Sequence, residues 1–167
     1  THWAGYHRRF AHAQLMLGDD VVLPPKRKKR IPPRGKGKFK LCVYLDTSYS
    51  CTSESKRFFS LVTNMSPERF EIALHSFSDG VKKHEIETGK FNYRLGGTNI
   101  DAVLDHAGSL SAEKEFDAIV VLTDGEFDDV RRNPRIRQPE KWHWVMTGRR
   151  RHTMPVESHF YDLPRRL

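Results

Sequence analysis

The sequence has 167 residues and a net charge of +8, with 37% hydrophobic and 11% aromatic residues. This length and composition are those of one globular domain with an appendage, and they exclude an intrinsically disordered chain. The sequence predicts neither a membrane span, which needs roughly 20 apolar residues, nor a secretory signal. Its two cysteines are too few for a disulfide framework or a zinc site, so we expect a reducing, cytoplasmic setting. Because no membrane span is predicted, we also expect no membrane partner.

The charge is unevenly distributed along the chain. Residues 1–40 carry 11 Lys and Arg against 2 Asp and Glu, residues 41–130 carry 8 against 16, and residues 131–167 carry 10 against 3. A uniformly basic nucleic-acid binder lacks such an acidic middle. The pattern fits a cation site in the middle segment, with basic surfaces elsewhere.

The first 38 residues are predicted to form an appendage in two parts. Residues 1–23 are predicted to form an amphipathic helical segment. Its helix covers residues 1–17 and ends at Gly18, because apolar side chains recur at three- and four-residue steps. They are Trp3, Tyr6, Phe10, Ala13 and Leu17. Residues 24–38 read as a basic linker, in which four prolines prevent a helix and like charges keep the chain solvated. It serves as a tether or, alternatively, as a binding segment for phosphate or an acidic surface.

Residues 39–167 are predicted to form an α/β domain. The segments 39–45 and 116–122 are apolar almost throughout, which is typical of buried central strands. Around them we expect a helix at 54–64, strands at 69–77, 81–86, 141–147 and 159–163, a loop at 89–95 and a helix from about 96–101 to 110. This order predicts a doubly wound, Rossmann-like, mostly parallel sheet with one antiparallel edge strand and helices on both faces.

Three polar loops are predicted to meet at one edge of this sheet. Asp46-Thr47-Ser48-Tyr49-Ser50 follows the first buried strand, Thr123-Asp124-Gly125 follows the second, and Gly96-Gly97-Thr98 opens a helix. Ligands of open α/β sheets bind outside the carboxyl ends of the strands, where the strand order reverses. The candidate metal ligands in these loops are Asp46, Ser48, Ser50, Thr98 and Asp124. This all-oxygen set suits Mg²⁺, or else Mn²⁺ or Ca²⁺, and offers zinc no thiolate or imidazole.

Each loop also has a structural interpretation. Asp46 and Ser48 can form Asx and Ser turns at a strand end. Thr98 with Asp101 resembles a helix capping box, and Asp124-Gly125 is an ordinary turn dipeptide. The occurrence of all three loops in order at one end of the sheet favours the metal site.

These residues resemble the von Willebrand factor A (vWA) domain with its metal-ion-dependent adhesion site, whose pattern is Asp-x-Ser-x-Ser, then a Thr, then an Asp. The resemblance covers residues 39–163 and implies the doubly wound fold described above. It implies that Ser48 and Ser50 bind the metal directly. It also implies that Thr98 does so in the ligand-occupied form, and that Asp46 and Asp124 bind directly or through water. Tyr49 stands where the family usually has Gly, so its ring either covers part of the site or contacts the partner.

The resemblance implies a non-enzymatic, metal-dependent protein-binding module, in which the cation captures an acidic residue of a partner protein. The Gly-Gly-Thr and Thr-Asp-Gly loops and the Trp-rich strand are similar to those of intracellular bacterial and phage vWA domains. Such members often work beside MoxR-type AAA ATPases. Two alternatives stay open. One is a metal-dependent phosphohydrolase or nuclease with Asp46 as nucleophile; the other is a nucleic-acid-associated protein that uses its basic segments.

Other charged and aromatic residues have two interpretations each. The arginines after the second loop either steer an acidic partner toward the metal or form a solvated loop; they are Arg131, Arg132, Arg135 and Arg137. The acidic residues Glu126, Asp128 and Asp129 are expected to be solvated rather than to tune the metal. Trp142 and Trp144 are expected in the core rather than as a base-stacking platform.

Overall fold

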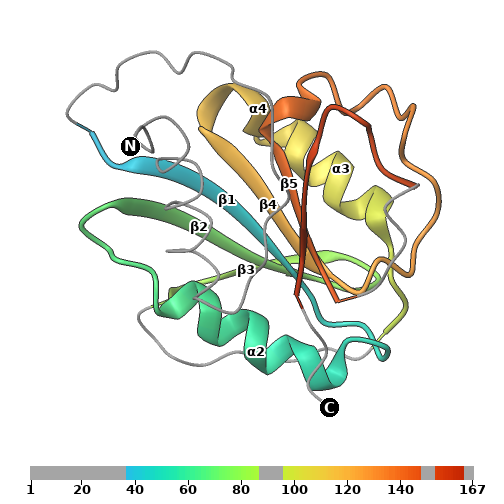
Figure 1. Ribbon diagram of the computed structural model, residues 1–167, viewed down its shortest axis with the longest axis horizontal. Helices are drawn as coiled ribbons and strands as arrows, with labels where there is room; N and C mark the ends of the chain where they lie inside the picture. Colours follow the sequence, from blue (N-terminus) through green and yellow to red (C-terminus); the bar gives the residue numbers. More distant parts are fainter. Residues whose placement is uncertain (1–36, 87–95, 148–152, 164–167) are drawn as a thin grey trace, which may run out of the picture.

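The computed structural model describes residues 37–86, 96–147 and 153–163. They form a six-stranded sheet in the order β3-β2-β1-β4-β5-β6 (Figure 1). The strands are β1 (Phe39–Asp46), β2 (Phe70–Phe77), β3 (Val81–His84), β4 (Ala118–Thr123), β5 (Trp142–Met146) and β6 (His159–Asp162). The helices are α2 (Thr52–Thr63), α3 (Ile100–Ser109), α4 (Ala112–Glu115) and the 3-10 turn η2 (Pro139–Lys141).

The sheet is parallel except at one edge. β1 pairs in parallel with both β2 and β4, and β5 pairs in parallel with β4 and β6. β3 is the antiparallel edge strand beside β2. From β1, the strands β2 and β3 are added on one side of the sheet, and β4, β5 and β6 are added on the other. The strand order therefore reverses between β1 and β4. The predicted doubly wound sheet with one antiparallel edge strand is confirmed.

One face of the sheet is covered by α2, as Figure 1 shows. The side chains of β1 that point to this face are Leu41, Val43 and Leu45, and they form one core with Phe58 and Val62 of α2. These residues occur at alternate positions in the strand and at a four-residue step in the helix, as a strand–helix packing requires. The helix predicted at 54–64 is thus confirmed, beginning two residues earlier.

The opposite face is covered by α3 and α4 (Figure 1). Cys42 and Tyr44 of β1 point to this face and form the second core with Val103 and Leu104 of α3. Trp142, Trp144 and Met146 of β5 belong to the same core and are almost fully buried. This burial confirms the two tryptophans as core residues and confirms helices on both faces of the sheet.

The connection from β4 to β5 contains no α-helix and is held instead by Glu113 of α4. Oε1 of Glu113 accepts hydrogen bonds from the backbone N–H groups of Arg137 and Gln138 and from the indole N–H of Trp142. The short helix α4, which has only four residues, was not predicted from the sequence. A charged acceptor of this kind ties the end of this segment firmly to α4.

Several predictions fall outside the described residues. They are the amphipathic segment at 1–23, residues 24–36 of the basic linker, and the loop at 89–95. None of the helices within the described ranges combines the length and apolar character needed to cross a membrane.

Candidate metal centre

The three predicted loops meet at the carboxyl edge of the sheet, where the strand order reverses. Asp46 is the last residue of β1, and Asp124 directly follows the neighbouring strand β4. The backbone N–H of Tyr49 donates to the carbonyl oxygen of Gly96 at 3.2 Å, which ties the first loop to the loop that precedes α3. Because β1 and β4 are adjacent and parallel, their ends place both carboxylates at the same point.

Asp46 lies at the base of the site and is fully buried. Its Oδ1 accepts the backbone N–H of Ser48 at 2.9 Å, and its Oδ2 accepts the hydroxyl of Thr123 at 2.6 Å. The first of these bonds is the Asx turn that the structural interpretation predicted. Both carboxylate oxygens have a second lone pair, so the turn and a role as metal ligand are compatible.

The carboxylates of Asp46 and Asp124 lack a cationic partner within the described ranges, where the ion pairs involve other residues. Burial raises the pKa of Asp46, hydrogen bonds from Ser48 and Thr123 oppose the rise, and the charge of Asp124 adds to it. Burial and the neighbouring negative charge both disfavour the ionised form of Asp46, and a bound cation would offset both effects. The electrostatics of this edge therefore favour a bound cation, and the site residues fit one.

Ser48 and Ser50 supply two hydroxyl groups in the loop that follows Asp46. Their Oγ atoms lie 3.1 Å apart and share a hydrogen bond. Ser48 is buried, whereas Ser50 is exposed. The two-residue spacing thus brings both hydroxyls together above the end of β1, as a pair of neutral oxygen ligands requires.

Asp124 is also buried, with 3% of its surface exposed. Its Oδ1 accepts the backbone N–H of Glu126 at 3.0 Å. Gly125 adopts φ = 80°, in the left-handed region where glycine has no steric penalty. Its N–H donates to Oγ1 of Thr123 at 3.0 Å, so the turn after β4 is fixed by a strand-end hydroxyl.

Thr98 is half-buried and lies one residue before the N-cap of α3. The capping interpretation of Thr98 was wrong, because Asn99 is the N-cap and its side chain accepts from the backbone N–H of Ala102 at 3.2 Å. Within the described part of the chain, the Thr98 hydroxyl has no hydrogen-bond partner. This is compatible with the predicted role of Thr98 as a metal ligand.

Cys51 is a residue that the sequence analysis left out of the site. A ligand atom from each of Asp46, Cys51 and Asp124 lies within 4.8 Å of the other two, and all three residues are buried. Their positions would allow these three atoms to bind one metal ion, so a thiol lies beside the predicted all-oxygen set. The sequence signal was the adjacency of Cys51 to the Asp-x-Ser-x-Ser string.

Thr123 and Ser55 also support the site without having been assigned to it. The hydroxyl of Ser55 lies 2.9 Å from the carbonyl oxygen of Asp46 and 2.7 Å from that of Cys51, and it donates to both. Thr123 was quoted in its loop but given no role. Each hydroxyl fixes the backbone or carboxylate of a residue that is a candidate ligand.

Tyr49 is 68% exposed and stands between the buried Ser48 and the exposed Ser50. Its backbone is held on both sides: the N–H donates to the carbonyl oxygen of Gly96, and the carbonyl oxygen accepts from the backbone N–H and the hydroxyl of Thr52. The phenol ring is thus available at the rim of the site, which favours contact with a partner over burial within the domain.

Two of the four arginines that follow the second loop are engaged within the molecule. Arg131 pairs with Asp129, and Arg135 pairs with both Asp101 and Asp105 of α3, at 2.5 and 3.2 Å. These ion pairs are exposed and contribute little to stability. Arg132 and Arg137 are also exposed and form none of the ion pairs found among the described residues.

No family model matches the sequence, and no curated protein matches it. Among solved structures, the chain is similar to an aerotolerance-related membrane protein from Bacteroides fragilis NCTC 9343 with multiple mutations to serines. The TM-score is 0.48 at 17% sequence identity, over 65% of this chain and 67% of that chain. A likeness at this level assigns neither a site nor an activity to the chain.

Proposed function

We propose that this chain is a metal-dependent protein-binding module of the vWA type. A divalent cation at the carboxyl edge of the sheet would capture an acidic residue of a partner protein. The ligands would be Asp46, Ser48, Ser50, Thr98 and Asp124. The first three lie in the loop after β1, Thr98 lies in the loop before α3, and Asp124 lies in the loop after β4. The module itself would perform no chemical step.

The observation that carries this proposal is the pair of buried carboxylates, Asp46 and Asp124, at the point where the strand order reverses. Neither has a Lys or Arg partner within the described ranges. A bound cation would remove the repulsion between them and would satisfy their free lone pairs. The neutral hydroxyls around them would leave that cation with residual positive charge, which favours a further anionic ligand.

The oxygen ligands favour Mg²⁺, with Mn²⁺ and Ca²⁺ as close alternatives. When bound, the ion would supply a positive centre for the partner's carboxylate. Cys51 is the competing ligand, because a thiolate would favour a softer ion such as Zn²⁺. The oxygen set and the Asp46–Cys51–Asp124 group share both aspartates. Only the first uses the hydroxyls and only the second uses the thiol, so mutations can show which set binds the ion.

The partner is proposed from the chemistry of the rim. Tyr49 provides an exposed aromatic contact beside the ion, and Arg132 and Arg137 provide exposed positive charge nearby in the chain. Both features suit an acidic protein segment. A MoxR-type ATPase stays a candidate through the family resemblance, and nucleic-acid binding through the basic segments stays a separate, compatible prediction.

Thermal unfolding with and without Mg²⁺ tests the metal dependence. A ligand that binds only the native state, at a free concentration 100 times its Kd, stabilises that state by about 2.7 kcal/mol. The melting temperature should therefore rise. We expect this rise in the wild type and its loss in Asp46→Asn and Asp124→Asn. Glu68→Gln is the matched control, because this exposed residue precedes β2 at the opposite edge of the sheet. An equal rise in all four proteins would contradict the proposal.

Capture of partners from the native cell extract, with Mg²⁺ or with EDTA, tests the binding function. We expect specific proteins to be retained in Mg²⁺ and lost in EDTA, and not to be retained by Asp46→Asn. A phosphate-ester assay should show no turnover. Metal-dependent hydrolysis that disappears in Asp46→Asn would instead support the phosphohydrolase alternative.

A further inference from the structure

The Gly96-Gly97-Thr98-Asn99 segment, which we call the Thr98 loop, is held by a turn that no candidate ligand belongs to. This turn is Ser78-Asp79-Gly80, between β2 and β3. The backbone N–H of Gly97 donates to Oδ1 of Asp79 at 2.9 Å. The backbone N–H of Asn99 donates to the carbonyl oxygen of Ser78 at 2.8 Å. The residues on both sides of Thr98 are therefore tied to the same turn.

The carboxylate of Asp79 lies directly against the backbone of the two glycines. A Cβ atom at Gly96 would overlap Oδ2 of Asp79 and would lie 3.0 Å from its Cγ. A Cβ atom at Gly97 would lie 3.1 Å from Oδ1. A Cβ atom at Gly96 would displace the carboxylate from this position, and one at Gly97 would crowd it. The Gly-Gly pair and Asp79 form one packing unit.

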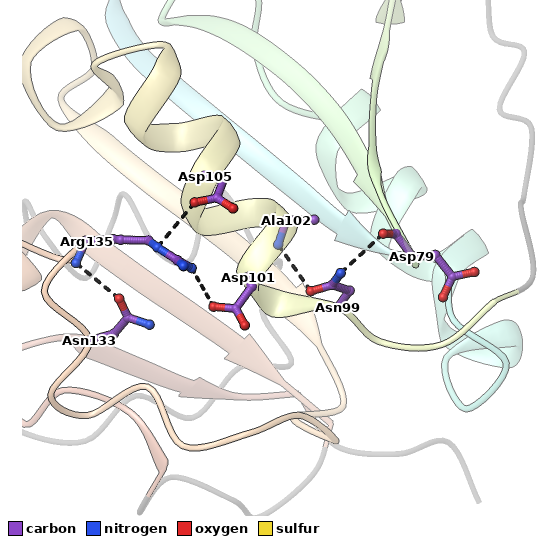
Figure 2. A network of polar contacts seen from close by, with 7 residues as sticks. All are labelled: Asp79, Asn99, Asp101, Ala102, Asp105, Asn133 and Arg135. Atoms are coloured by element: carbon purple, nitrogen blue, oxygen red, sulfur yellow. Dashed lines mark hydrogen bonds and ion pairs between the residues drawn. The ribbon is translucent and has the colours of Figure 1, made fainter.

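Asn99 extends this connection into α3, as Figure 2 shows. Its side-chain Nδ2 donates to the carbonyl oxygen of Asp79 at 3.3 Å, while its Oδ1 caps the helix. On the other side of the helix, Arg135 pairs with Asp101 and Asp105 (Figure 2). Asn99 thus fixes the Thr98 loop at its carboxyl end, where the loop joins α3.

We infer that Asp79 is a positioning residue for the candidate metal site, which holds the Thr98 hydroxyl in place for the cation. This inference rests on the proposed function. The hydrogen bonds of Asp79 go to Gly97 and Asn99, on either side of Thr98, and to no candidate ligand among the described residues. Asp79 therefore fixes the backbone around Thr98. If a loop becomes ordered only when the ligand binds, its loss of conformational entropy weakens binding. A loop that is ordered before binding avoids this loss of affinity.

Mg²⁺ titration by calorimetry tests the inference in wild type, Asp79→Ala, Thr98→Ala and the double variant. We expect Asp79→Ala to weaken Mg²⁺ binding by roughly fivefold to tenfold, the effect of releasing about one backbone residue. The double variant should bind as Thr98→Ala does, because Asp79 acts only through the Thr98 loop. Global stability should change little, since Asp79 is exposed. Asp128→Ala is the matched control, as an exposed aspartate near the second loop that has none of these bonds.

Hydrogen exchange gives an independent readout of the same variants without metal. The amides of Gly97 and Asn99 should lose protection in Asp79→Ala and keep it in Thr98→Ala. Asp79→Asn keeps an acceptor oxygen and should retain most of the protection, which covers the case that Asp79→Ala folds poorly. If wild type and Asp79→Ala bind Mg²⁺ equally, the inference is overturned while the proposed function stands. If the two effects add in the double variant, Asp79 acts by another route and the inference is also overturned. Absence of Mg²⁺ binding in the wild type overturns both.

Discussion

The hydroxyl of Thr123 donates a 2.6 Å hydrogen bond to Oδ2 of Asp46, and the two residues are 77 positions apart in the chain. Both side chains are fully buried, at the ends of the adjacent strands β4 and β1. Oγ1 of Thr123 also accepts the N–H of Gly125. One hydroxyl therefore joins the base of the candidate site to the turn that presents Asp124.

Replacing this hydroxyl should destabilise the domain. Thr123→Val keeps the shape of the side chain but leaves the Asp46 carboxylate and the Gly125 N–H without this partner. The expected loss is about 1–3 kcal/mol of unfolding free energy, the cost of unsatisfied buried polar groups. Urea denaturation measures it. Thr123→Ser keeps the hydroxyl and should retain more stability than Thr123→Val; the reverse order would contradict the role of this bond.

Cys51 separates the two candidate ligand sets. Burial raises the pKa of the Cys51 thiol above its ordinary value, and the charges of Asp46 and Asp124 add to the rise. A thiol that stays protonated is a poor ligand for Mg²⁺. Cys51→Ala should therefore keep the full Mg²⁺-dependent rise in melting temperature, measured against its own metal-free value. Loss of that rise would show that the Asp46–Cys51–Asp124 group holds the ion.

His75 should make stability depend on pH. Its ring is buried, stacks on Tyr44 with centroids 5.2 Å apart, and contacts His106 edge-on at 4.6 Å. Burial lowers the pKa of His75 to about 4, and the neighbouring His106 adds to the shift. The unfolded chain takes up this proton near the ordinary pKa of about 6.5 and the folded chain does not, so stability falls as pH drops from 6.5 toward 4.

The size of the effect follows from the width of that window. The shift corresponds to on the order of 3 kcal/mol lost across it. His75→Phe keeps a ring against Tyr44 and removes the titration, so its unfolding free energy should fall less steeply between these pH values. Guanidinium denaturation at pH 4, 5, 6 and 7 gives both slopes. Equal slopes would mean that His75 does not titrate differently in the folded state.

The two buried tryptophans of β5 should respond differently to the same substitution. They stack with centroids 5.6 Å apart. Nε1 of Trp142 donates to Oε1 of Glu113 at 2.9 Å, whereas Nε1 of Trp144 has no partner within the described residues. Trp142→Phe should therefore cost about 1.5–3 kcal/mol more than Trp144→Phe, the contribution of a hydrogen bond to a charged group. Equal losses in denaturation experiments would argue against a stabilising role of this bond.

The layout of the sheet could be predicted from the sequence because its signals are local. The apolar runs that became β1 and β4 require burial on both faces, which places them at the centre. Parallel neighbours then bring Asp46 and Asp124 to one edge. The alternation of Trp142, Trp144 and Met146 likewise fixes one face of β5.

The supporting contacts could not be predicted, because they depend on side-chain geometry between distant segments. A threonine at a strand end carries no local sign that its hydroxyl will reach Asp46. The position of the Cys51 thiol depends on where α2 begins. Asn99 rather than Thr98 caps α3 because the turn at residues 78–80 fixes the backbone there. The bond from Asn99 to Asp79 joins residues that are 20 positions apart in the chain.

Crystallography with Mn²⁺ in place of Mg²⁺ tests the central claim most directly, because the anomalous signal locates the ion without prior assumptions. The account predicts one peak at the carboxyl edge of the sheet, roughly 2.0–2.4 Å from the hydroxyl oxygens of Ser48 and Ser50. Thr98, Asp46 and Asp124 should complete its surroundings, directly or through water. A peak bonded to the sulfur of Cys51, or no peak beside Asp46, would contradict the proposed metal site.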